Sequence, residues 1–110
     1  MNKSAAQVPE TEDCRASAAD GTLVRELAIL NRRGLHARAT AKLVQCIEGF
    51  VAEVTVSRCG ETVGGTSIMG ILTLGAGLGS TITVTARGPA AAQVLDAVAA
   101  LVAEKFGEDD

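Results

Sequence analysis

The segment STITVTAR, residues 80–87, constrains the fold more than any other stretch of the chain. Ile82, Val84 and Ala86 alternate with threonines at the positions between them. Because successive side chains of a β-strand point to opposite faces, this alternation predicts a strand with one buried face and one solvated face. Such a strand needs a covering layer on its apolar side only.

Three further segments alternate in the same way, and three others have helical spacing. The predicted strands cover residues 22–30, 51–58 and a short stretch around Val63, and CGET (59–62) turns the second into the third. The predicted helices start at Ala37 and end before Gly49, make one or two turns within 66–74, and run from Pro89 to Phe106. We expect buried positions at Leu23, Leu27, Ile29, Leu43, Val44, Ile47, Ala52, Val54, Val56, Val94, Val98, Leu101 and Val102, with Arg25 on the apolar side of the first strand. The order β-α-β-β-α-β-α predicts an α+β fold, an open-faced two-layer sandwich in which three helices cover one face of a four-stranded antiparallel sheet.

The chain is long enough for one modest core. It has 110 residues, of which 47% are hydrophobic. Residues 1–21 lack apolar periodicity, so we predict a flexible N-terminal tail there and a single domain over residues 22–110. No signal-peptide core or bilayer-length apolar run is present, and Cys14, Cys46 and Cys59 have neither disulfide-framework nor zinc spacing. These features predict a cytoplasmic protein with free thiols, no bound metal and no membrane insertion.

The charge distribution bears on the kind of partner. A net charge of −3 and only two aromatic residues, both Phe, argue against nucleic-acid binding. Arg32, Arg33, Arg38 and Lys42 nevertheless crowd the single histidine. This cluster is either an ordinary solvated face or a docking patch for an acidic partner.

His36 is the only histidine, and it lies between a turn at Gly34 and the predicted helix. The first N–H groups of a helix have no internal partner, so an anion on His36 would sit at the positive end of the dipole, within reach of Arg38. Neutral imidazole is a competent nucleophile toward phosphorus. There is no second histidine and no carboxylate at motif distance. The residues alone leave two interpretations open, a transient phosphate site and a passive capping residue.

Two separated motifs in register carry a family resemblance. GLHARATAKLV (34–44) and TSIMGILTLGAGLGSTITVTARG (66–88) resemble the HPr family, the histidine phosphocarriers of the phosphoenolpyruvate-dependent phosphotransferase system. The match runs from about Thr22 to the C-terminus in the same order of elements. The segments GFVAEV (49–54) and AAQVLDAVAALVAEKFGEDD (91–110) further resemble the nitrogen-branch members of that family.

The resemblance implies a phosphocarrier, expected to be a monomer, rather than an independent enzyme, with no cofactor. It implies that His36 accepts a phosphoryl group on Nδ1 from phosphorylated enzyme I and passes it to an enzyme IIA-type acceptor. Arg38 matches the family's phosphate-contacting arginine, and Ala37 supplies a helix-start N–H group. Ala39 stands where the family usually has proline, which leaves one more N–H donor and a looser first turn.

Ser67 is predicted to cap the short second helix. By resemblance it also matches the regulatory serine that HPr kinase/phosphorylase modifies, and the two roles are compatible because a helix N-terminus favours a phosphate. The resemblance places partner contacts at Ile68, Met69, Leu72, Arg33 and Lys42, whereas we expect Ile71 and Leu74 to be buried.

Two other functions are weighed against the carrier. A regulatory binding module would use its phosphorylation state to control a transcription factor or kinase, with transfer secondary. Relatives of that kind lose the histidine, which this chain retains. An enzyme acting on a small molecule ranks third, since no second catalytic group is evident.

Overall fold

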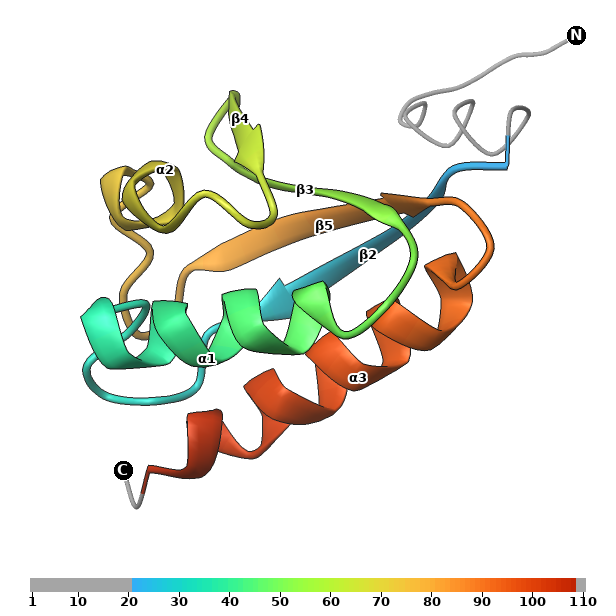
Figure 1. Cartoon of the computed structure of the whole chain (residues 1–110). Helices are drawn as coiled ribbons and strands as arrows, with labels where there is room; N and C mark the ends of the chain where they lie inside the picture. Colours follow the sequence, from blue (N-terminus) through green and yellow to red (C-terminus); the bar gives the residue numbers. More distant parts are fainter. Residues whose placement is uncertain (1–20, 109–110) are drawn as a thin grey trace, which may run out of the picture.

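The computed structural model describes residues 21–108. The predicted tail, apart from Gly21, and Cys14 lie outside the described residues, so the tail and the domain boundary stay predictions. The elements follow the predicted order (Figure 1): β2 (Leu23–Ala28), α1 (Ala37–Glu48), β3 (Glu53–Arg58), β4 (Glu61–Gly64), α2 (Ile68–Thr73), β5 (Thr81–Arg87), α3 (Ala91–Ala103) and a short 3-10 turn, η3 (Lys105–Gly107). Across residues 21–108, no helix combines the length and apolar character needed to span a membrane.

The four strands form one antiparallel sheet in the order β2-β5-β3-β4. The last strand, β5, is central: its Ala86 lies opposite Leu23 of β2 on one side and Val54 of β3 on the other. A tight turn at Cys59 and Gly60 connects β3 to β4, as predicted. The sequence-based prediction of a four-stranded antiparallel sheet is therefore confirmed.

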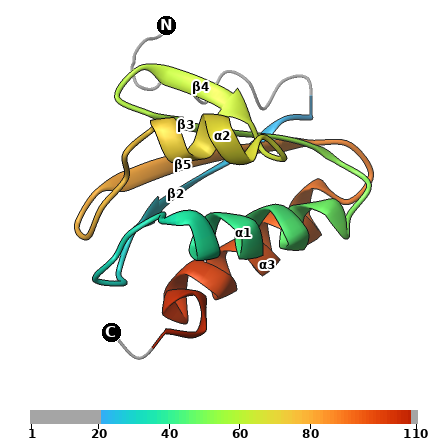
Figure 2. The same ribbon diagram turned by 60° about the vertical axis from the view of Figure 1, so that its left-hand side comes forward.

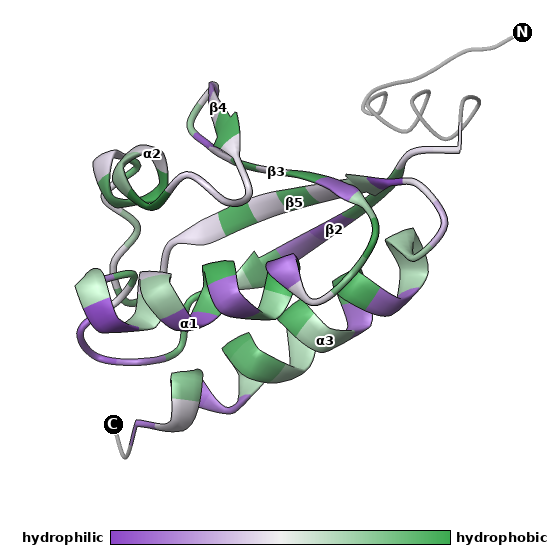
Figure 3. Cartoon of the chain, in the orientation of Figure 1, coloured by the Kyte–Doolittle hydropathy of each residue, from purple (hydrophilic) through white to green (hydrophobic). Residues whose placement is uncertain are grey.

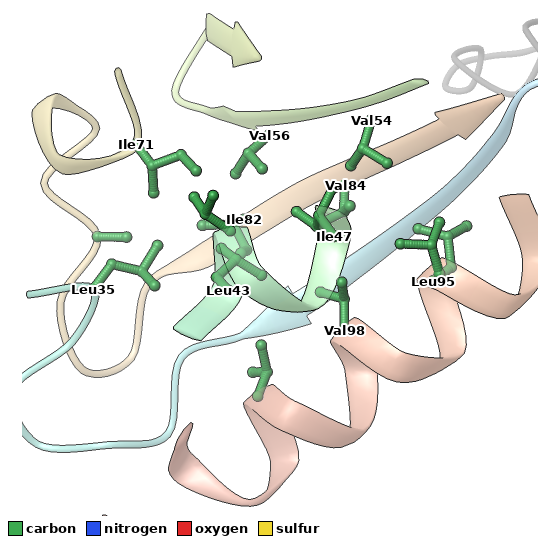
Figure 4. Close-up of a cluster of buried hydrophobic side chains, with 14 of the residues drawn as sticks. Leu35, Leu43, Ile47, Val54, Val56, Ile71, Ile82, Val84, Leu95 and Val98 are labelled. Carbon is green, nitrogen blue, oxygen red and sulfur yellow. The ribbon is translucent and has the colours of Figure 1, made fainter. Parts of the chain in front are cut away.

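The core lies between the sheet and the helices. Helices α1 and α3 run side by side across one face of the sheet, and α2 lies near the β4 edge, where it contacts α1 and β4 (Figures 1 and 2). Ile82, Val84 and Ala86 are buried in this core, as predicted. Figure 4 shows Ile82 and Val84 among side chains from α1, α3 and α2. In the hydropathy colouring of Figure 3, β5 alternates between green and pale residues, and the turn before α1 is purple.

Strand β2 departs from the predicted burial at its first residue. Leu27 is half-buried and Ile29 fully buried, but Leu23 is 39% exposed, at the start of a strand that lies at the edge of the described sheet. Arg25, on the inner side, donates to Asp96 of α3 at 3.0 Å. This exposed ion pair explains how an arginine fits on an otherwise apolar face.

The last helix is shorter than predicted at both ends. Pro89 lies in the turn before α3 rather than in its first helical turn, and the Ala91 N–H donates to the Gly88 carbonyl there. The helix ends at Ala103 instead of Phe106, because Lys105 and Phe106 adopt positive φ angles of 59° and 56°. The prediction that the helix continues to Phe106 is therefore wrong, and the chain bends back toward α1.

Two of the three cysteines lie within the described residues. Cys46 and Cys59 are both free thiols, as predicted. Cys59 is exposed at the hairpin turn, whereas partial burial raises the pKa of the Cys46 thiol.

Candidate functional site

The turn before α1 is held against the loop before β5. The Leu35 N–H donates to the Ala76 carbonyl at 2.9 Å. Gly34 has φ +67°, and a Cβ there would lie 2.5 Å from the same Ala76 oxygen. Only glycine combines this left-handed conformation with so close an approach of two backbones. The turn therefore holds His36, which follows Leu35, in a fixed position.

His36 is the N-cap of α1, with extended backbone angles (φ −76°, ψ −179°). Its carbonyl accepts from the Thr40 N–H at 2.9 Å, the first hydrogen bond of the helix. Within residues 21–108, the N–H groups of Ala37, Arg38 and Ala39 have no hydrogen-bond acceptor. Three unpaired donors at the positive end of a helix dipole make this end receptive to an anion.

A carboxylate reaches the histidine from the far end of the chain. One oxygen of Glu108 contacts Nε2 of His36, and the other accepts from the Asn31 side-chain amide at 3.0 Å. Asn31 is fully buried and also donates to the Gly34 carbonyl at 2.8 Å, so it ties the glutamate to the turn. The sequence offers no carboxylate at motif distance from the histidine, and the partner that the structure supplies lies 72 residues away in sequence.

The electrostatics of this cluster favour ionised Glu108. Hydrogen bonds from Asn31 and His36, together with the charges of His36 and Arg33, hold the pKa of Glu108 below its ordinary value, against a smaller opposing effect of desolvation. The side chains of His36 and Glu108 are 18% and 16% exposed, so the pair is only partly accessible to solvent.

The C-terminal strap, which we define as Lys105–Glu108, carries Glu108 to the histidine. Phe106 of the strap is buried in the core, with 1% of its surface exposed. The Phe106 carbonyl accepts from the Lys42 ammonium at 2.6 Å. Lys42, predicted to contact partners, thus holds the strap through its charged end, and its role in docking stays a prediction.

The other basic residues predicted for the site lie at the surface. Arg38, in the first turn of α1, is exposed, and among residues 21–108 its guanidinium makes no hydrogen bond or ion pair. Arg33 is exposed in the preceding turn, close enough to influence the charge of Glu108. Both guanidinium groups are therefore accessible at the end of the molecule that carries His36.

Helix α2 provides an apolar surface next to this end. Ser67 is its N-cap, as predicted, and the Ser67 hydroxyl accepts from the Gly70 N–H at 3.1 Å. Ile68 and Met69 are 42% and 71% exposed and Leu72 is half-buried, whereas Ile71 and Leu74 are buried as expected.

Sequence reasoning missed three residues near the site. Leu78, 60% exposed, belongs to the loop that contacts the histidine turn, and its position between glycines in GAGLGS was the only local signal. Asn31 begins the NRRG turn, where an Asx residue is common, but its link to Glu108 is not a local feature. Glu108 itself has no signal in the neighbouring sequence.

The two ring nitrogens of His36 have different surroundings. Nε2 faces Glu108, whereas Nδ1 makes no hydrogen bond to any residue of the described range. An sp² nitrogen without a partner, beside unpaired backbone donors and an exposed guanidinium, is suited to carry an anionic group. Within the described residues, no group of His, Cys, Asp and Glu side chains could hold a metal ion.

Fold and site together define a class: small open-faced α+β sandwiches that present one histidine at a helix N-terminus. A family model described as "PTS HPr component phosphorylation site" matches residues 23–104. This match, together with the sequence identity to individual relatives, shows that the chain belongs to the HPr family, the phosphocarrier proteins of the phosphotransferase system.

Individual relatives agree with this assignment. The chain is 48% identical to phosphocarrier protein HPr of Cupriavidus necator over 88 residues, a match that covers 80% of this chain and 99% of the relative. It is 42% identical over 86 residues to phosphocarrier protein NPr of Shewanella violacea, covering 78% and 94%. The crystal structure of HPr-C-His from Thermoanaerobacter tengcongensis superposes with a TM-score of 0.77 at 33% identity, covering 80% and 99%.

Proposed function

We propose that this protein carries a phosphoryl group on Nδ1 of His36, taken from phosphorylated enzyme I and passed to an enzyme IIA-type acceptor. The Nδ1 lone pair attacks phosphorus while the bond from phosphorus to the donor nitrogen breaks. The acceptor later attacks the same phosphorus, and the electrons of the P–Nδ1 bond return to the ring. The observation that carries the proposal is the free Nδ1 of the His36 N-cap beside three unpaired N–H groups of α1.

The charge on the transferred group has two sources of stabilisation in this proposal. The N–H groups of Ala37 and its neighbours supply fixed dipoles, and Arg38 supplies a mobile guanidinium that approaches the phosphoryl oxygens from solvent. Ala39 lies in the first turn of α1 and is fully buried. It keeps the N–H that the family's usual proline lacks, so one more donor lies at the phosphate end.

The partner-binding surface in this proposal is the exposed side of α2 with Arg33. Ile68, Met69 and Leu72 provide apolar contact, and Arg33 and Arg38 provide positive charge beside it. A surface of this kind suits a partner with an apolar patch rimmed by acidic residues. The carrier is proposed to act as a monomer in the cytoplasm, where such partners reach it by diffusion.

Ser67 is proposed as a regulatory phosphorylation site for a kinase of the HPr kinase/phosphorylase type. Its hydroxyl is exposed, and a phosphate there would lie next to Ile68 and Met69. The added charge of about −2 would repel an acidic partner from this surface. ATP-dependent phosphorylation of the wild type but not of Ser67→Ala by the organism's own kinase would support this role, and its absence with an active kinase would remove it.

The carrier function is tested by intact mass spectrometry. The protein is mixed with its own organism's enzyme I, Mg²⁺ and phosphoenolpyruvate, and His36→Ala is treated in parallel. The expected result is one acid-labile phosphate on the wild type and none on the variant. No gain on the wild type, with enzyme I shown to be active, would reject the carrier function and favour a regulatory binding module instead.

A further inference from the structure

We propose that Glu108 is a positioning residue for His36, which fixes the tautomer of the ring and aims Nδ1 at the incoming phosphorus. The proposal rests on phosphoryl transfer at His36 as set out above. Glu108 lies outside residues 23–104, the range matched by the family model, so the family assignment itself gives this residue no role.

The hydrogen-bond pattern determines which ring nitrogen carries the proton. Asn31 donates to one oxygen of Glu108, and the lowered pKa of that carboxyl keeps it ionised near neutral pH. An ionised carboxylate only accepts hydrogen bonds, so its contact with the ring requires a proton on Nε2. In the neutral ring the lone pair then lies on Nδ1, the nitrogen proposed to attack.

The same contact favours the transfer step. When Nδ1 bonds to phosphorus, the ring takes on imidazolium character with its proton still on Nε2. A carboxylate at Nε2 stabilises that developing positive charge, in the way that the buried aspartate supports the histidine of a serine protease. When the group leaves for the acceptor, the P–Nδ1 electrons return and the ring is again neutral with Nε2–H.

Three features of the strap indicate that this contact is built into the fold. Phe106 is buried in the core, its carbonyl holds the Lys42 ammonium, and two successive non-glycine residues adopt positive φ. Positive φ at non-glycine residues is unfavourable and persists where surrounding contacts enforce it. The strap thus holds the Glu108 carboxylate at Nε2 of the ring.

The tautomer is tested without any partner protein. In ¹⁵N NMR spectra at a pH where the ring is neutral, protonated and unprotonated ring nitrogens give well-separated signals. The wild type is expected to show a protonated Nε2 and an unprotonated Nδ1. Glu108→Gln places an amide that can also donate to Nε2, so both ring signals are expected to move toward each other. Glu104→Gln, the same change at an exposed residue that caps α3, is the matched control and is expected to leave them in place.

The kinetic test measures the rate of phosphoryl transfer from phosphorylated enzyme I to each protein. Glu108→Gln is expected to be slower than wild type by about tenfold to hundredfold, the range for loss of a charge-assisted hydrogen bond, and Glu104→Gln to match wild type. Circular dichroism spectra and thermal unfolding curves of both variants establish that each is folded at the assay temperature.

The outcomes separate this proposal from the carrier function. A wild type that gains no phosphate rejects the carrier function, whereas the ring signals still report on the tautomer. A wild type that is phosphorylated, with Glu108→Gln matching Glu104→Gln in both rate and ring signals, overturns the positioning role and leaves the carrier function intact.

Discussion

Gly34→Ala is expected to destabilise the turn that presents His36, because Gly34 combines a positive φ with a close backbone approach. Two other glycines each have one of these features alone, so their variants give the cost of each separately. At Gly34 a positive φ of 67° coincides with a close approach, since an added Cβ would lie 2.5 Å from the Ala76 oxygen. Gly75 has nearly the same conformation, φ +65°, but no heavy atom within 4 Å of an added Cβ. Gly65 lacks a positive φ, but its added Cβ would lie 2.9 Å from atoms of Val54.

The magnitudes follow from these contacts. Gly75→Ala should lower the free energy of unfolding by about 1–2 kcal/mol, the cost of the left-handed conformation alone. Gly65→Ala should lower it by about 1–3 kcal/mol, the cost of overpacking alone. Gly34→Ala has both costs and also displaces the oxygen that accepts from the Leu35 N–H, so its free energy of unfolding should fall by roughly 3–6 kcal/mol. Gly77→Ala, with neither feature, should change it by no more than about 0.5 kcal/mol.

The assay is urea denaturation followed by far-ultraviolet circular dichroism, because the chain has no Trp or Tyr for fluorescence. Equal m-values across the four variants would show that the differences lie in stability rather than in the unfolded state. The reasoning is refuted if Gly34→Ala costs no more than Gly75→Ala, since the contact with Ala76 would then exert no steric constraint.

Three further predictions follow from single contacts. Ser67→Ala removes the acceptor of the Gly70 N–H and should lower the free energy of unfolding by about 1 kcal/mol in urea denaturation; no change would mean that the cap is not formed in solution. Phe106→Ala empties a buried position and should cost about 3–5 kcal/mol, whereas a cost below 1 kcal/mol would show that the strap is not packed. The Asn31 hydrogen bond, the largest cause, lowers the pKa of Glu108, so this contact stabilises the fold fully above the unfolded-state pKa and is lost as the pH falls through the folded-state pKa. The side-chain amide signals of Asn31 in NMR should shift over that acidic range in wild type, and a shift of the same size in Glu108→Gln would contradict the assignment.

The elements that could be predicted from sequence are those with local signals. Alternation at 80–87 gave β5, and the hydroxyl of Ser67 followed by a short apolar run gave the start of α2. His36 was placed correctly at a helix boundary because Gly34 and the apolar spacing after it are both close in sequence. Each of these signals depends on neighbours within a few residues.

The elements that could not be predicted depend on contacts between distant residues. Glu108 meets His36 only because the chain turns at Lys105 and Phe106, two residue types that do not favour positive φ. The sequence assigns Lys42 either to a solvated face or to partner docking, but in the structure its ammonium group donates to the carbonyl of Phe106, a contact with no local signal. The exposure of Leu23 follows from its position in an edge strand, which the order of strands in the sheet decides.

The central place of β5 has a consequence for how the protein is made. Among residues 21–108, β2 pairs only with β5, and the β3–β4 hairpin joins β2 only through β5. On the ribosome, the first strand therefore waits until nearly the whole domain has been synthesised before it gains a neighbour, and closing so long a loop is entropically costly. A chain that has not yet reached β5 and the C-terminal strap thus has neither the paired sheet nor the carboxylate of Glu108 beside its histidine.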